Sequence, residues 1–135
     1  MKEITVDAVI ENIDTVTAFV NDFLDSCGCP MKTKMQMDIA IDEIFSNISF
    51  YAYQDGTGTA TVRAERQDDP QAVCITFIDG GIPYNPLAKE DPDVTLSAEE
   101  RKIGGLGIYI VKKNMDEMLY EYSDGKNRLS IKKYI

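Results

Sequence analysis

An aspartate followed by two glycines ends one predicted strand and could hold a flat ligand that carries an amino group. The apolar run that begins at Ile75 ends in Asp79, Gly80 and Gly81. A carboxylate at a strand end can accept a hydrogen bond from an amino group, and adjacent glycines let a ligand approach the backbone closely. Asp-Gly is also a common turn sequence, so this segment alone fits a simple turn equally well.

A glycine-rich segment before a later predicted helix could bind an anion. Gly104, Gly105 and Gly107 lead into the helical stretch from Ile108 to Met115. Unpaired N–H groups and the positive end of the helix dipole favour anions at a helix N-terminus, and glycines let phosphate oxygens come near. The segment has neither the preceding strand and spacing of the dinucleotide fingerprint nor the Gly-Lys-Ser/Thr ending of a P-loop. A lid hinge without a ligand is the alternative interpretation.

A glutamate and an asparagine one turn apart form a polar pair on another predicted helix. On a helical wheel over residues 32–53, Glu43 and Asn47 share a side with Gln36 and Ala40. We expect this side to lie well away from the core stripe, which comprises Met37, Ile41, Ile44, Phe45, Ile48 and Ala52. Taken alone, the pair is typical of two solvated surface residues.

The elements that must position these residues follow from hydrophobic periodicity. We expect strands at residues 4–6, 59–66, 72–78, 117–122 and 129–135, and helices at about 9–28, 32–53 and 108–115. The stretch from 80 to 102 shows no sustained period and is long for a passive connector. This order predicts an α+β two-layer sandwich, with helices on one face of a mostly antiparallel mixed sheet, in a single domain spanning residues 1–135.

Composition excludes several classes of function. The 135 residues include 14 basic and 23 acidic side chains, and the net charge of −9 disfavours nucleic-acid and membrane partners. Histidine is absent, which excludes Ser-His-Asp catalysis, His-ligated zinc and phosphohistidine relay. Cys27, Cys29 and Cys74 cannot complete a tetrahedral zinc site, so we expect reduced structural thiols. Because no long apolar run or leader pattern is present, we expect a cytoplasmic protein.

The three motifs occur in one order at compatible separations, and this combination is specific. Glu43-x-x-x-Asn47, Asp79-x-Gly81 and Gly104-Gly-Leu-Gly107 resemble the nucleotide-binding boxes of the GHKL ATPase superfamily, which has the Bergerat, or histidine-kinase-like ATPase, fold. The resemblance runs from about Met35 to the C-terminus.

Within that superfamily, the chain looks most like the anti-sigma-factor serine/threonine kinases of the RsbW type. The segments that carry this likeness are Ile82-Pro-Tyr-Asn-Pro-Leu87, the helical stretch after Gly104 with Met115-Asp-Glu117, and Asp124-Gly-Lys-Asn-Arg-Leu129 in the last hairpin. The small, stand-alone size is also similar.

The resemblance implies that the chain binds ATP and Mg²⁺ and assigns a role to each box. Glu43 would be the general base that polarises a serine hydroxyl or a water, and Asn47 would ligate Mg²⁺. Asp79 would bind the adenine amine, with Gly81 letting the base lie against the backbone.

The resemblance further implies a phosphate cradle and a lid. Gly104, Gly105, Leu106 and Gly107 would hold the phosphates at the start of their helix. A lid would bring a positive charge to the phosphates from Lys89, Arg101 or Lys102.

These expectations describe a protein serine/threonine kinase. It would transfer the γ-phosphate of ATP to an anti-anti-sigma-type regulatory partner, sequester a sigma factor, and form a homodimer. Two alternatives remain open: a nucleotide-responsive binding module with little or no phosphotransfer, and an acidic interaction domain that binds no nucleotide. Intact Glu43 favours the kinase over the binding module.

Overall fold

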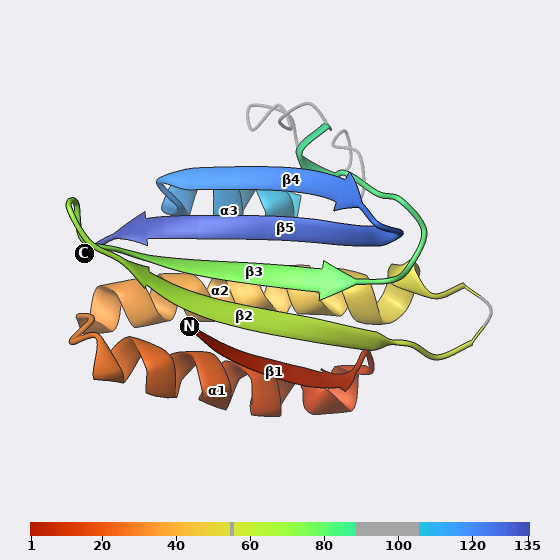
Figure 1. Ribbon diagram of the computed structural model, residues 1–135, viewed down its shortest axis with the longest axis horizontal. Helices are drawn as coiled ribbons and strands as arrows, with labels where there is room; N and C mark the ends of the chain where they lie inside the picture. Colours follow the sequence, from red (N-terminus) through yellow and green to blue (C-terminus); the bar gives the residue numbers. More distant parts are fainter. Residues whose placement is uncertain (55, 89–105) are drawn as a thin grey trace.

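A five-stranded sheet forms one layer of the molecule. The computed structural model describes residues 1–54, 56–88 and 106–135 (Figure 1). Its strands are β1 (Lys2–Asp7), β2 (Thr59–Gln67), β3 (Ala72–Asp79), β4 (Glu117–Ser123) and β5 (Lys126–Tyr134). Their order across the sheet is β1-β2-β3-β5-β4, and all of the pairings in these parts of the chain are antiparallel.

Three helices form the second layer and cover one face of the sheet (Figure 1). They are α1 (Ile13–Ser26), α2 (Met31–Asn47) and α3 (Leu106–Asn114), and a short 3-10 turn, Ile10–Asn12, precedes α1. The predicted α+β two-layer sandwich with helices on one face is therefore confirmed. In the residues that the structure describes, no helix combines the length and the apolar character that a membrane crossing needs.

The core lies between the sheet and the helices because each strand alternates buried and less buried positions. On β5, for example, Leu129 and Ile131 are buried, whereas Ser130 between them is half-buried. The largest fully buried side chains come from both layers: Leu24, Met37, Ile41, Phe45, Ile75, Phe77 and Ile131. Burial of this apolar surface is the main force that holds the two layers together.

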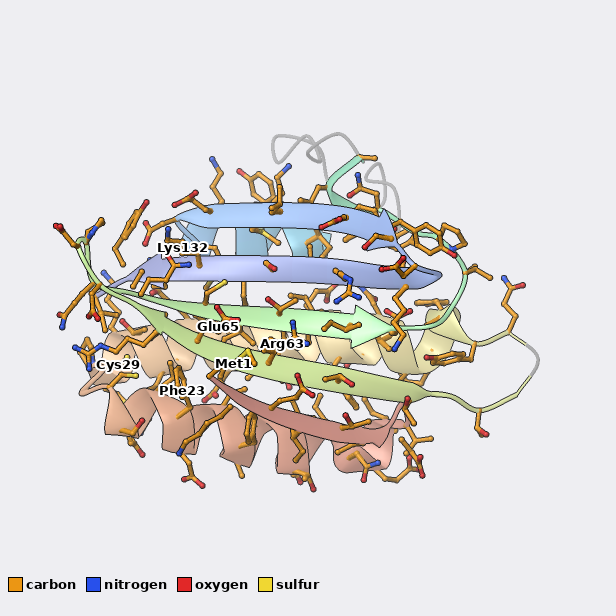
Figure 2. The ribbon with its side chains drawn as sticks, viewed as in Figure 1. Met1, Phe23, Cys29, Arg63, Glu65 and Lys132 are labelled. Carbon is orange, nitrogen blue, oxygen red and sulfur yellow. The ribbon has the colours of Figure 1, made fainter. Side chains whose placement is uncertain are left out.

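The opposite face of the sheet is polar. Figure 2 shows Arg63, Glu65 and Lys132 on this face. Arg63 forms an ion pair with Glu3 across strands β1 and β2 at 2.9 Å. The hydroxyl groups of Thr76 and Ser130 lie 2.8 Å apart and form a hydrogen bond between β3 and β5. Glu43, Asn47 and Gly107, which the sequence indicates as ligand-binding residues, lie on helices α2 and α3 in the other layer.

Two predicted chain reversals have the expected backbone. Helix α1 ends at Ser26, and Gly28 has a left-handed φ of +72°. The N–H of Cys29 then donates to the carbonyl of Leu24 at 3.1 Å, which closes the helix in a Schellman-type cap. Asp124 and Gly125 both have positive φ, at 54° and 74°, and join β4 to β5 in a tight hairpin.

The second predicted helix differs from the expectation in two respects. The α-helix ends at Asn47, and the chain continues as a π-helical turn, η2 (Ile48–Ala52). Ala40 is fully buried, and Glu43 and Asn47 are half-buried. The expectation that this side of the helix lies well away from the core is therefore wrong for Ala40, because α3 packs along it.

Candidate functional site

The polar pair on α2 meets the first turn of α3. Asn47 Nδ2 donates a hydrogen bond to Glu43 Oε1 at 3.2 Å. The Glu43 carboxylate lies so close to Gly107 that a β-carbon at that position would be less than 3.0 Å from three of its atoms. Glu43 and Gly107, which are 64 residues apart in the printed sequence, are therefore in direct contact.

This placement suits the chemistry of negative charge. The first turn of α3 offers backbone N–H groups without helical partners and the positive end of the helix dipole. A carboxylate is favoured at such a position, and a phosphate group is favoured for the same reason. Because Gly107 has no side chain, the Glu43 carboxylate can lie directly against the backbone of this turn.

Asp79 is buried at the C-terminal end of β3, with 7% of its surface exposed. Its Oδ1 atom accepts hydrogen bonds from the Gly81 N–H at 2.9 Å and from Asn127 Nδ2 at 3.0 Å. Its Oδ2 atom receives no hydrogen bond from the residues that the structure describes. One carboxylate oxygen is thus fixed by the protein, and the other is left as an acceptor for a ligand.

The loop after Asp79 is docked against the end of the second helix. The N–H of Ile82 donates to the carbonyl of Ala52 at 3.0 Å. A β-carbon at Gly81 would lie less than 3.0 Å from that same carbonyl, so only glycine fits there. This contact places the Asp79 motif beside the helix that carries Glu43 and Asn47.

Tyr53 holds the same loop from a second point. Its hydroxyl group accepts a hydrogen bond from the Gly80 N–H at 2.7 Å and donates one to the carbonyl of Thr59 at 2.6 Å. The phenol therefore joins the start of β2 to the end of β3, and two successive residues of the loop, Gly80 and Gly81, are fixed by neighbouring residues of the helix end.

An open hollow of about 410 Å³ lies along this junction. Residues 52–54, 56–57 and 80–82 line it, including the two glycines that follow Asp79. Small-molecule sites typically enclose about 300–1,000 Å³, so the hollow is large enough for a nucleobase. Of the predicted site residues that the structure describes, Gly81 lines the hollow, whereas Asp79, Glu43, Asn47 and Gly107 do not. Figure 1 shows the C-terminal ends of β3 and of the second helix at the same end of the molecule.

Helix α2 and the π-helical turn that continues it connect the two ends of the candidate site. Glu43 lies on α2 and Ala52 ends the π-helical turn that continues it. At roughly 1.5 Å per residue, these positions are about 13 Å apart along the axis. The site is therefore elongated, with the hollow near Gly81 at one end and the Glu43 carboxylate against α3 at the other.

Two side-chain oxygen atoms fit the metal ion and the nucleobase that the motifs imply. With its amide nitrogen bonded to Glu43, Asn47 keeps an Oδ1 atom to which none of the described residues donates. Carboxamide and carboxylate oxygens are the ligands that Mg²⁺ prefers. The Oδ2 atom of Asp79, an acceptor without a donor, fits the amino group of adenine.

The structure does not describe the positions of some predicted site residues. Gly104, Gly105 and the three lid residues Lys89, Arg101 and Lys102 are outside the described residues. Leu106 is the first residue of α3.

Sequence reasoning missed three residues that build the site: Ala52, Tyr53 and Asn127. Asn127 is 6% exposed and hydrogen-bonded to Asp79. It lies in the segment from Asp124 to Leu129 that carries the likeness to RsbW-type kinases, but nothing in that segment links it to Asp79. Tyr53 and Ala52 resemble ordinary helix-end residues, and their roles depend on a loop that arrives from β3.

Comparisons with known proteins agree with the fold. A family model for the histidine kinase-like ATPase domain matches residues 6–133 of the chain. The serine/threonine-protein kinase BtrW of Bordetella bronchiseptica is 25% identical over 103 residues, which cover 74% of this chain and 70% of that protein. Because the family model spans nearly the whole sequence, the chain belongs to the family of histidine kinase-like ATPase domains, within the GHKL superfamily.

Proposed function

We propose that the chain is a protein serine/threonine kinase that binds Mg-ATP and transfers the γ-phosphate to a regulatory protein. Its family is one of ATPase domains, and its relative BtrW is named a serine/threonine-protein kinase. The observation that carries the proposal is the meeting of Glu43, Asn47 and the first turn of α3 at Gly107.

Glu43 is the residue that we assign to proton transfer. Its carboxylate lies against the helix end where phosphate groups are favoured, so a hydroxyl group attacking the γ-phosphate can reach it. The carboxylate would accept the proton of that hydroxyl as the new O–P bond forms, while the bond between the γ-phosphorus and the oxygen bridging it to the β-phosphate breaks and ADP leaves. The hydrogen bond from Asn47 Nδ2 holds the carboxylate in place for this step.

The remaining residues bind and orient the nucleotide. The Asp79 Oδ2 atom accepts a hydrogen bond from the amino group of adenine, and Gly81 keeps the backbone open to the base. The N–H groups at the start of α3, with Gly104, Gly105 and Leu106, receive the phosphates, and Lys89, Arg101 and Lys102 supply the lid. Asn47 Oδ1 would hold Mg²⁺, which would offset the negative charge of the phosphate groups.

The protein partners are part of the proposal. The likeness to RsbW-type kinases supports an anti-anti-sigma-type protein as the phosphate acceptor and a sigma factor as a second partner held by a homodimer. A net charge of −9 supports protein partners over nucleic acid.

A phosphotransfer assay tests this function. The protein is incubated with Mg²⁺, γ-labelled ATP and, one at a time, the proteins of its source organism that resemble anti-anti-sigma factors, and the phosphosite is mapped. We expect label on a serine or threonine, and Glu43→Ala should slow transfer by about a hundredfold or more while it still binds ATP. Asp42→Ala, on the exposed side of the same helix, is the matched control.

Two outcomes would contradict parts of this proposal. Transfer by Glu43→Ala at the parent rate would overturn the role of Glu43 as the general base and leave the kinase activity standing. Binding of ATP with no transfer to any candidate would instead support the binding-module alternative.

A further inference from the structure

Asn127 lies directly opposite Asp79 in the pairing of β5 with β3. Its Nδ2 group donates to Asp79 Oδ1 at 3.0 Å and to the carbonyl of Ile82 at 2.8 Å. Its Oδ1 atom accepts from the Tyr84 N–H at 3.0 Å and from the hydroxyl group of Tyr120. The amide is 6% exposed, so these four bonds form where water does not replace them easily.

The four bonds fix which way the amide points. The nitrogen faces two acceptors, the Asp79 carboxylate and a carbonyl, and the oxygen faces two donors. A flipped amide would set its oxygen against the carboxylate and its N–H₂ group against the Tyr84 N–H, and both contacts would be repulsive. Asn127 therefore always presents an N–H group to Asp79.

The N–H group of Asn127 determines which ligand group Asp79 can bind. Asp79 Oδ1 accepts two hydrogen bonds, one from the Gly81 N–H and one from Asn127 Nδ2. Two hydrogen bonds to one oxygen fix the rotamer of the carboxylate. The remaining oxygen, Oδ2, accepts no hydrogen bond from the described residues, so it can receive an amino group and repels a carbonyl oxygen.

We propose that Asn127 is a positioning residue that makes the nucleobase site selective for an amino group over an oxo group at the position facing Asp79. The inference rests on the proposed binding of ATP. It adds a residue on β5, outside the three motifs, as the origin of base selectivity.

The test compares two nucleotides that differ at this one group. ATP carries an amino group on carbon 6 of the purine, and inosine triphosphate carries an oxo group there. A hydrogen bond to a charged group contributes enough to change affinity by about tenfold or more. We therefore expect the unmodified protein to bind Mg-ATP at least about tenfold more tightly than Mg-inosine triphosphate in titration calorimetry.

Asn127→Asp replaces the donor with an acceptor of the same shape. Two carboxyl groups would then face each other, and they would share a proton because like charges at this distance do not both ionise readily. A shared proton lets the pair donate to an oxo group, so we expect the preference for ATP to fall by about tenfold. If Asn127 had a purely structural role, Asn127→Asp would weaken the binding of both nucleotides equally and leave the ratio of the two affinities unchanged.

Tyr120→Phe gives a milder second variant, and Ser130→Ala is the matched control. Tyr120→Phe removes one of the two donors on Asn127 Oδ1, and we expect the ATP preference to fall about two- to threefold. Ser130 lies on the same strand but on the polar face of the sheet, so Ser130→Ala should keep the parent ratio. If Asn127→Asp does not fold, the ratio of the affinities of Tyr120→Phe for Mg-ATP and Mg-inosine triphosphate tests the proposal.

The outcomes separate this inference from the proposed function. One result would be that the unmodified protein binds ATP while Asn127→Asp and Tyr120→Phe keep its ratio of affinities for Mg-ATP and Mg-inosine triphosphate. This result would overturn the role of Asn127 and leave the kinase proposal intact. Failure of the unmodified protein to bind either nucleotide would overturn both. A reduced ratio in the variants, with the parent ratio in Ser130→Ala, supports the inference.

Discussion

The carboxylate of Glu43 packs directly against the α-carbon of Gly107. Any β-carbon at position 107 would overlap the Glu43 carboxyl carbon and both of its oxygens. The contact joins the helix that carries the polar pair to the helix whose N-terminus favours anions. It depends on a glycine at one position and a carboxylate at the other.

Gly107→Ala should separate catalysis from stability. The added methyl group displaces the end of the flexible Glu43 side chain, so the backbone can stay in place. The higher helix propensity of alanine, about 1 kcal/mol, offsets the cost of this displacement, so stability should change by about 1 kcal/mol or less. Phosphotransfer should fall by about a hundredfold because the proposed base is moved. Single-turnover transfer and denaturant unfolding measure the two effects.

The control for Gly107→Ala lies on the same helix. Ile110 is 39% exposed, and Ile110→Ala should leave transfer at the parent rate. Parent transfer rates in Gly107→Ala would show that the contact with Glu43 has no role in catalysis.

Gly81→Ala should weaken both the fold and the binding of ATP. Here the obstacle is the backbone carbonyl of Ala52, which cannot rotate away as a side chain does. Overpacking of this kind costs about 1–3 kcal/mol, and it would push the loop after Asp79 off the helix end. Denaturant unfolding and calorimetric titration with Mg-ATP measure the losses.

The neighbouring glycine provides the comparison for stability. A β-carbon at Gly80 would meet only the Tyr53 hydroxyl oxygen, at 3.5 Å, which is an ordinary contact. Gly80→Ala should therefore destabilise the protein much less than Gly81→Ala. Equal losses for the two variants would contradict the role of the Ala52 contact.

The thiols should make stability depend on alkaline pH. Burial raises the pKa of Cys29, with the nearby Cys27 and Asp25 acting in the same direction, and burial also raises the pKa of Cys74. A raised folded-state pKa gives stability that is complete below the thiol pKa of the unfolded chain, about 8.5, and that is lost as pH rises through the folded-state pKa.

Alkylation and unfolding check this pH dependence. Since the thiolate is the reactive form, iodoacetamide at pH 8 should modify Cys29 and Cys74 more slowly in the folded protein than in denaturant. The unfolding free energy should fall as the pH rises above about 8.5, the thiol pKa of the unfolded chain, and Cys29→Ala combined with Cys74→Ala should reduce that fall. Alkylation of both thiols at the unfolded rate would refute the account.

Local periodicity was enough to predict the elements of the fold. The expected strand at residues 59–66 is Thr59–Gln67, and the expected helix at 108–115 is Leu106–Asn114. The end of α1 was predictable because Gly28 is a typical C-terminal cap residue. These features depend on residues that are close together in the sequence.

The parts of the site that could not be predicted depend on contacts between distant segments. Asp79 and Asn127 are 48 residues apart and meet because β5 pairs with β3, with β4 at the edge. The burial of Ala40 likewise depends on where α3 packs. Neither sheet order nor helix docking can be derived from the periodicity of one element.

The most direct test of the central claim is a thermal-unfolding series with Mg-ATP. Ligand at a hundredfold above its dissociation constant should add about 2.7 kcal/mol of stability to the unmodified protein. Asp79→Ala should lose this gain because Asp79 is assigned to the binding of adenine. Glu43→Ala should keep it because Glu43 is assigned to proton transfer. An unmodified protein whose melting temperature does not change with Mg-ATP would contradict the account.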